Sequence, residues 1–244
     1  MCVLFSSVSE GGKMAIVIIG GTGVGKSTVG NIISQRIGYR LYEVGHVVKQ
    51  LYFEKVQREN ILIYGDKTIA QSKIDELTNL HGKDYFTRKR LQYTGEMVRK
   101  YGNDYFIRAL MSVHAEERII IVGARTFSEM NAVLEKMPNT YFVALYCNTD
   151  RVERRFKNRE CMYMDENTAK NIFSNRYEIE HSRGLDDVER WCNIRIQTDY
   201  RSPEEIADII IQSYYRFLLD KNSDTGGKKN ERNNGSCGSL FDLY

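Results

Sequence analysis

Residues Gly20 to Ser27 read Gly-Gly-Thr-Gly-Val-Gly-Lys-Ser, which fits the phosphate-binding pattern Gly-x-x-x-x-Gly-Lys-Ser/Thr. The segment ends a short, apolar, β-branched run, Ala15 to Gly20, which is typical of a buried parallel strand. It opens a segment with apolar residues at helical spacing, Thr28 to Ile37. Strand, glycine-rich loop and helix follow one another as a P-loop requires. We therefore predict a binding site for a nucleoside triphosphate, ATP with magnesium.

The residue types in this loop match its expected chemistry. Glycines let the backbone turn so that its N–H groups surround phosphate oxygens, and the helix N-terminus adds positive potential. Lys26 is expected to bridge the β- and γ-phosphates, and the Ser27 hydroxyl is the predicted magnesium ligand. The predicted nucleotide-binding residues are Gly20, Gly21, Thr22, Gly23, Val24, Gly25, Lys26, Ser27 and Thr28.

The rest of the chain alternates between apolar strands and amphipathic helices. Further strands are predicted at 39–43, 118–123, 140–147 and 191–197. Helices are predicted at 47–58, at three places between 66 and 115, at 128–137, from 151 onward, at 167–181, and from 202 onward. Asn103 or Asp104 is the expected N-cap of the third helix in 66–115, and Thr149 or Asp150 that of the helix from Arg151.

This alternation predicts an α/β fold of three layers, a P-loop NTPase with a five-stranded parallel sheet. The folded domain is expected to span 14–219, with a helical acceptor region at about 44–115 and a lid at about 151–176. Residues 1–13 are interpreted as a disordered extension or as a misassigned start before Met14. Residues 220–244 are expected to form a disordered tail, whose apolar end Leu240–Tyr244 either docks weakly on a partner or has no role.

Composition excludes several other classes of protein. The 244 residues include 35 basic and 32 acidic side chains, and a net charge of +3 gives no strong nucleic-acid signal. No apolar run approaches the roughly 18 residues of a membrane span. The five cysteines show no metal-ligand spacing, so we expect free thiols in a reducing cytoplasm.

Arginine placement supplies a second signal. Arg125 comes just past the end of a predicted strand, where ligands bind in open α/β sheets. Arg151, Arg155 and Arg159 follow the next strand and share one helical face. Arginine suits phosphoryl transfer because it stays charged and binds phosphate oxygens with two N–H groups. The other interpretation of the helical arginines is a solvated basic face.

The P-loop together with these arginines resembles the nucleoside monophosphate kinase group, and among its members the dephospho-CoA-kinase-like and nucleotide-kinase-like proteins. Four further stretches carry the resemblance over about 15–219: Tyr42–Val48, Tyr101–Tyr105, Val122–Arg125, and Arg176–Glu180 with Gly184-Leu185. The resemblance implies transfer of the γ-phosphoryl of ATP to a nucleotide or nucleotide-like acceptor.

The resemblance also implies roles for individual residues. Lys26 would hold the donor phosphates, and Arg125 would hold the acceptor or the transferring group. Arg151, Arg155 and Arg159 would belong to a closing lid, with Arg151 on the nucleotide and the other two among the catalytic groups. Arg176 could reach the phosphates from behind the lid, while Glu178 and Glu180 could orient the arginines or simply face solvent.

Two positions depart from the pattern of the family. Its members often have an aspartate where this chain has Val122 and another where it has His46. A carboxylate there would hold metal-bound water or orient the attacking oxygen. Glu43 and Asp104 are the candidate substitutes. Two hypotheses follow: a small-molecule kinase, or a catalytically weak ATP- or GTP-binding switch that acts through a protein partner.

Overall fold

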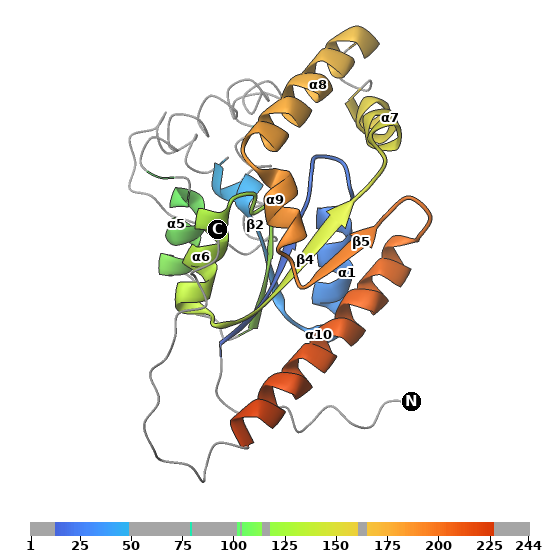
Figure 1. The fold of residues 1–244 in the computed structure, drawn as a ribbon. Helices are drawn as coiled ribbons and strands as arrows, with labels where there is room; N and C mark the ends of the chain where they lie inside the picture. Colours follow the sequence, from blue (N-terminus) through green and yellow to red (C-terminus); the bar gives the residue numbers. More distant parts are fainter. Residues whose placement is uncertain are drawn as a thin grey trace.

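A computed structural model describes residues 13–48, 79, 102, 104–113, 118–160 and 165–226. Five parallel strands form one sheet in the order β2-β3-β1-β4-β5, with helices on both faces (Figure 1). The elements are β1 (Met14–Ile19), α1 (Lys26–Ile37), β2 (Arg40–Glu43), α5 (Tyr105–Val113), β3 (Arg118–Val122), α6 (Phe127–Lys136), β4 (Asn139–Tyr146), α7 (Thr149–Glu160), α8 (Glu166–Ser182), α9 (Leu185–Arg190), β5 (Ile194–Gln197) and α10 (Pro203–Gly226).

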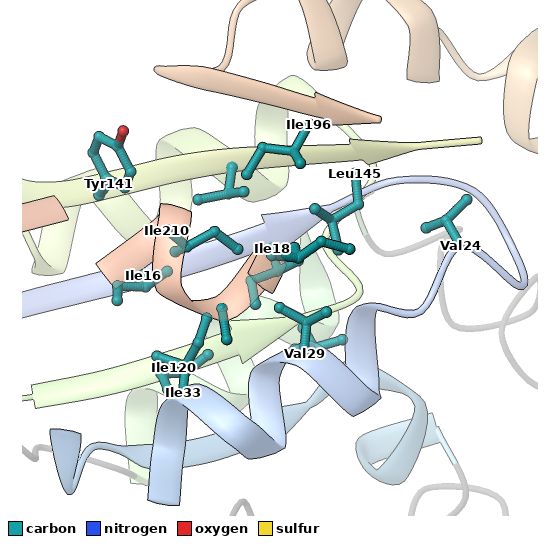
Figure 2. Close-up of a cluster of buried hydrophobic side chains, with 14 of the residues drawn as sticks. Ile16, Ile18, Val24, Val29, Ile33, Ile120, Tyr141, Leu145, Ile196 and Ile210 are labelled. Atoms are coloured by element: carbon teal, nitrogen blue, oxygen red, sulfur yellow. The ribbon is translucent and has the colours of Figure 1, made fainter. Parts of the chain in front are cut away.

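The central strand β1 is buried on both faces, which explains why its sequence lacks polar residues. Successive side chains of a strand point to opposite faces, so Ile16 and Ile18 enter one core while Val17 and Ile19 enter the other. Figure 2 shows the first of these cores, where Ile16 and Ile18 lie among side chains of the sheet and the neighbouring helices. Two separate cores therefore hold the sheet between two helical layers.

Each core is covered by its own set of helices. The first contains buried residues of α1 and α10, with Phe156 of α7 and Phe173 of α8 toward the carboxyl ends of the strands. The second contains buried residues of α5, α6 and α9. Figure 1 shows α7 and α8 rising beyond the carboxyl ends of the strands, next to the loop between β1 and α1. These ends of the sheet are thus the place where loops and helices surround a potential ligand.

The predicted fold class is confirmed, and four local predictions need correction. The predicted strand 191–197 is shorter, because its first residues follow the short helix α9, which the sequence patterns did not predict. The helix expected from Arg151 begins at Thr149, where Asn148 rather than Thr149 or Asp150 acts as the cap: its Oδ1 accepts a hydrogen bond from the Asp150 N–H at 3.0 Å.

The other two differences concern helix ends. Residues 44–48 are already helical, three residues before the predicted start at Val47. Helix α10 continues to Gly226, into the segment 220–244 that was expected to be disordered. This last part of the helix is polar in sequence, so hydrophobic periodicity does not detect it. Most predictions for 49–101, 1–12 and the end of the tail lie outside the described residues.

Among the described helices, none combines the length and the apolar character that crossing a membrane requires.

Candidate functional site

The loop Gly20–Gly25 turns from β1 into α1 through backbone conformations that favour glycine. Gly20, Gly23 and Gly25 have φ angles of +142°, +83° and +98°. At Gly20 a Cβ atom would lie 2.2 Å from the carbonyl oxygen of Leu145 in β4, so this position also requires close backbone approach. The strand, the turn and the helix N-terminus at Gly25 together form the anion-binding loop that the sequence predicts.

Lys26 lies folded over this loop. Its Nζ donates hydrogen bonds to the carbonyl oxygens of Gly20 at 2.7 Å and Gly21 at 2.5 Å. Burial, followed by the nearby positive charge of Arg125, lowers the pKa of Lys26 from 10.5 to about 7. The amino group of Lys26 is therefore held against the loop in an electropositive and poorly solvated environment. Such an environment favours the binding of an anion.

Glu180 connects helix α8 to the P-loop. Its carboxylate accepts hydrogen bonds from the Thr22 N–H at 2.8 Å and from the Thr22 hydroxyl at 2.9 Å. The same carboxylate lies 3.1 Å from Arg125 Nη2, and only 4% of the side chain is exposed. Burial opposes the charged form, but Arg125 and Lys26 outweigh it and lower the pKa of Glu180. Glu180 thus connects α8, the P-loop and Arg125 through an ionised carboxylate.

The backbone of Arg125 is held by a capping box that was not predicted from the sequence. Thr126 and Glu129 form a capping box at the start of α6. The Glu129 carboxylate also accepts a hydrogen bond from the Arg125 N–H at 2.6 Å. Because this capping box fixes the backbone, the Arg125 side chain is aimed back toward Glu180. The Thr-x-x-Glu spacing in the sequence is the signal that could have revealed Glu129.

Arg176 and Glu178 of α8 lie in different environments. Arg176 is partly buried, and its positive charge lowers the pKa of both Lys26 and Glu180. Glu178, in contrast, has an exposed side chain. Of the two glutamates considered from sequence, Glu180 is therefore the one that orients an arginine.

The arginines of α7 lie elsewhere. The guanidinium of Arg151 lies 5.2 Å from the ring centre of Tyr200, and Arg155 Nη2 donates to the carbonyl oxygen of Thr198 at 3.4 Å. The Asp199 carboxylate accepts hydrogen bonds from the Asn148 N–H and so ties this loop to the start of α7. The Arg159 side chain lies outside the described atoms. The structure thus brings Arg151 and Arg155 to the loop after β5, away from the contacts of Lys26.

The two positions that depart from the family pattern are both buried. Val122 ends β3 inside the core and packs against α1. His46 is 6% exposed, and its Nε2 lies 3.8 Å from an oxygen of Glu43. Glu43 ends β2 directly beside Val122 in the sheet register. A carboxylate is therefore present on the neighbouring strand, at the edge of the sheet where the family has one on β3.

Asp104, the other candidate substitute, has a structural contact. Its carboxylate lies 2.6 Å from Arg108 Nε, and the Arg108 guanidinium also binds Glu135 of α6 at 2.8 Å. These side chains hold α5 against α6 on the surface. Glu43 is the better-placed of the two carboxylates.

At the P-loop, the Ser27 hydroxyl is the predicted protein ligand for a divalent cation. The described residues contain no group of three histidine, cysteine or acidic side chains that could hold a metal ion. The Ser27 hydroxyl is exposed at the start of α1, next to Lys26. This donor set fits an ion that arrives with nucleotide phosphates and takes most of its ligands from them and from water.

Replacing Glu180 by glutamine should lower the free energy of unfolding at pH 7 by roughly 2 kcal/mol or more, because the Arg125 charge loses its partner and Thr22 loses a charged acceptor. The folded-state pKa of Glu180 is lowered, so its contribution is present above 4.5 and is lost as pH falls below that value. Urea unfolding of both proteins at several pH values tests this. Glu178→Gln, an exposed neighbour, is the control, and equal losses in both variants would contradict the assignment.

Comparisons with known proteins agree with the fold. No family model matches the chain. The shikimate kinase of Bacillus licheniformis is 20% identical over 207 residues, which cover 81% of this chain and 91% of that protein. The crystal structure of a gluconokinase from Sinorhizobium meliloti 1021 is similar with a TM-score of 0.52 and 16% identity, covering 87% of this chain and 98% of that chain.

A shikimate kinase from Acinetobacter baumannii, solved in complex with shikimate, is similar at a TM-score of 0.45 and 16% identity, covering 85% of this chain and 93% of that chain. At these identities the structural likeness shows the fold, a five-stranded parallel sheet with the helices of a P-loop kinase. The narrower resemblance to dephospho-CoA-kinase-like proteins is not tested by these relatives and stays a prediction.

Proposed function

We propose that this protein is an ATP-dependent kinase that transfers the γ-phosphoryl group to a hydroxyl of a small molecule. The observation that carries the proposal is the cluster at the P-loop, where the Glu180 carboxylate binds Thr22 and pairs with Arg125 at 3.1 Å, next to the loop on which Lys26 lies. Lys26 and Arg176 also lower the pKa of this carboxyl group, so three basic side chains from three segments act on one place. Phosphoryl transfer needs such positioned positive charge more than it needs covalent chemistry.

In this proposal the P-loop residues bind the triphosphate, and Lys26 turns from the carbonyl oxygens of Gly20 and Gly21 to phosphate oxygens. Because Glu180 anchors Arg125, that guanidinium is positioned toward the transferring group. Arg151 and Tyr200 would flank the nucleotide at the loop after β5, where an arginine and an aromatic ring can stack on a base. Arg155 and Arg159 would complete the lid on α7.

Ser27 would be the protein ligand of a magnesium ion bound with ATP, and that ion would neutralise charge on the β- and γ-phosphates. Glu43 and His46 are the proposed groups that accept the proton of the acceptor hydroxyl. They lie at the end of β2, which pairs with β3, and β3 in turn pairs with the P-loop strand β1. Both side chains are largely buried. A carboxylate or a neutral imidazole at this place is a chemically suitable general base.

The acceptor class follows from two sources. The resemblance to nucleoside monophosphate kinases favours a nucleotide-like acceptor, while the similar proteins are named for shikimate and gluconate. All of these acceptors combine a hydroxyl or phosphate nucleophile with a negative charge that Arg125 could bind. Purified protein should therefore be assayed for ADP formation with shikimate, gluconate, nucleoside monophosphates and dephospho-CoA. The proposal predicts acceptor-dependent ADP formation with one of these or a related anion.

The second candidate is a nucleotide-binding switch with little catalysis. Val122 favours it, because the end of β3 offers a buried methyl surface where the family pattern has an aspartate. Loss of a base or of an outer ligand typically costs about 10²–10⁴-fold in rate while binding survives. The switch predicts saturable ATP binding and no acceptor-dependent ADP formation.

Binding of ATP at pH 8 should be accompanied by proton uptake of up to about one proton per site. The pKa of Lys26 near 7 leaves about 90% of the free side chain neutral at that pH. Phosphate charges favour the ammonium form and raise this pKa, so the complex takes up the proton. Titration calorimetry in two buffers of different ionisation enthalpy measures the uptake. An enthalpy that does not depend on the buffer, in wild type as in Lys26→Met, would contradict the role of Lys26.

A further inference from the structure

A cavity of about 230 Å³ lies beside the P-loop on the side of α8 and α9. Its lining includes Thr22, Tyr146, Phe173, Tyr177, Glu180 and Glu189. That volume has room for several water molecules at about 30 Å³ each. Gly21 and Val24 of the P-loop also line it, whereas Lys26, Ser27, Arg125 and Arg176 do not, so the cavity borders the loop without reaching these four side chains. The Glu180 carboxylate, bonded to Thr22, forms part of the cavity wall.

Glu189 of α9 is the unusual member of this lining. Glu189 is only 8% exposed, and its backbone carbonyl accepts hydrogen bonds from the N–H groups of Trp191 and Cys192. Within the described part of the chain, its carboxylate forms no hydrogen bond and no ion pair. Burial, and then the neighbouring charge of Asp186, raise the pKa of this carboxyl group. The Glu189 oxygens are not sealed from water, but a carboxylate in so enclosed a place is poorly solvated and favours a partner that donates hydrogen bonds. A ligand in the cavity beside Glu189 can be that partner.

The positive groups near Glu189 have other partners. His181 Nδ1 lies 2.9 Å from the Asp186 carboxylate. The Arg195 guanidinium lies 5.2 Å from the ring centre of Tyr146. Lys26 Nζ binds carbonyl oxygens of the P-loop. Arg195, His181 and Lys26 lower the pKa of Glu189 from a distance, but none of them makes an ion pair with it. The negative charge of the Glu189 carboxylate therefore has no directly paired positive group among the described residues.

Aromatic rings cover the opposite part of the cavity. Phe173 and Tyr177 are neighbours on α8 with ring centres 6.0 Å apart, and Tyr177 also contacts His181 at 4.0 Å between ring centres. Rings of this kind offer apolar contact and attract a cation to their faces. The cavity thus combines one unmatched carboxylate with a surface suited to a short hydrocarbon chain.

We propose that this cavity binds a small organic ammonium ion, whose N–H groups donate hydrogen bonds to Glu189 and whose alkyl chain packs on Phe173 and Tyr177. The cavity shares Glu180 and Thr22 with the P-loop cluster, but the residues that would hold the ammonium ion, Glu189, Phe173 and Tyr177, do not belong to that cluster. Inorganic cations lack the apolar body, and a carboxylate ligand would add negative charge beside Glu180, Asp186 and Glu189.

The test compares three probes of nearly equal size on the full chain in 150 mM salt: propylammonium, 1-propanol and propionate. Saturation-transfer NMR and titration calorimetry measure binding. We expect saturable binding of propylammonium alone, with a Kd on the order of millimolar, as four non-hydrogen atoms allow. Glu189→Gln should weaken that binding at least tenfold, whereas the exposed Glu178→Gln should leave it unchanged.

Equal binding of all three probes, or no saturable binding of propylammonium to the wild type, would overturn the proposal. So would unchanged binding in a folded Glu189→Gln protein. If that variant does not fold, the comparison of the three probes on the wild type still decides the matter. ATP binding, measured in parallel, keeps failure of this site distinct from failure of the kinase proposal.

Discussion

Replacing Lys26 by alanine should lower kcat for phosphoryl transfer by roughly 10²–10³-fold or more, the usual effect of removing one positioned charge from a transition state. The change removes the ammonium that is stored against the carbonyl oxygens of Gly20 and Gly21. It should not unfold the protein, because Lys26 is partly exposed and does not belong to either hydrophobic core. Initial rates with the best acceptor, measured at saturating ATP, give the effect.

Lys136→Ala is the matched control for Lys26→Ala. Lys136 ends α6, is exposed, and lies on a helix that contributes to the opposite core from α1. Its replacement should change kcat less than twofold. An unchanged kcat in Lys26→Ala, or an equal decrease of kcat in both variants, would contradict a catalytic role for Lys26.

Replacing Gly20 by alanine should lower the free energy of unfolding by roughly 2–5 kcal/mol. The added Cβ would lie 2.2 Å from the Leu145 carbonyl oxygen, and a φ angle of +142° is unfavourable for any residue with a Cβ. Overpacking and backbone strain each cost about 1–3 kcal/mol. Because β1 and β4 must move apart, the loop loses its shape, and ATP binding should weaken more than in any surface variant. Urea unfolding and ATP titration measure the two effects.

Gly45→Ala is the corresponding control for the glycine effect. Gly45 is exposed and helical, and no atom lies within 4 Å of the position that its Cβ would take. Alanine there should be neutral or stabilise the protein by up to about 1 kcal/mol, because it is the better helix former. If Gly20→Ala proves as stable as Gly45→Ala, the close approach between the P-loop strand and β4 is wrong.

The fold could be predicted because its signals are local. Apolar runs such as Ala15 to Gly20 mark strands that are buried on both faces, and the Gly-Lys-Ser sequence fixes the turn that follows. The end of α10 and the short helix α9 escaped prediction because neither has a full apolar face. Asn148 was missed as a cap because three adjacent polar residues can all serve, and only the structure shows which side chain accepts the bond.

The site was predictable in part. Lys26 and Arg125 followed from spacing and from position at a strand end, whereas the partner of Arg125 could only be narrowed to two candidates, Glu178 and Glu180. Glu180 is 158 residues from Thr22, and nothing in its surrounding sequence distinguishes it from the exposed Glu178 two residues earlier. Packing of α8 against the P-loop decides between them. Likewise, the unmatched charge of Glu189 depends on burial and on the partners of Arg195 and His181, which no sequence pattern specifies.

The central claim, that the P-loop cluster transfers phosphate to a small acceptor, is tested most directly by ³¹P NMR of a reaction with ATP, magnesium and each acceptor. The account predicts a phosphate-ester signal on one acceptor that grows as the γ-phosphate signal of ATP falls, and its absence in Lys26→Ala. Growth of inorganic phosphate alone would indicate an ATPase. An unchanged ATP spectrum with every acceptor, in protein that binds ATP, would contradict the kinase and support the nucleotide-binding switch.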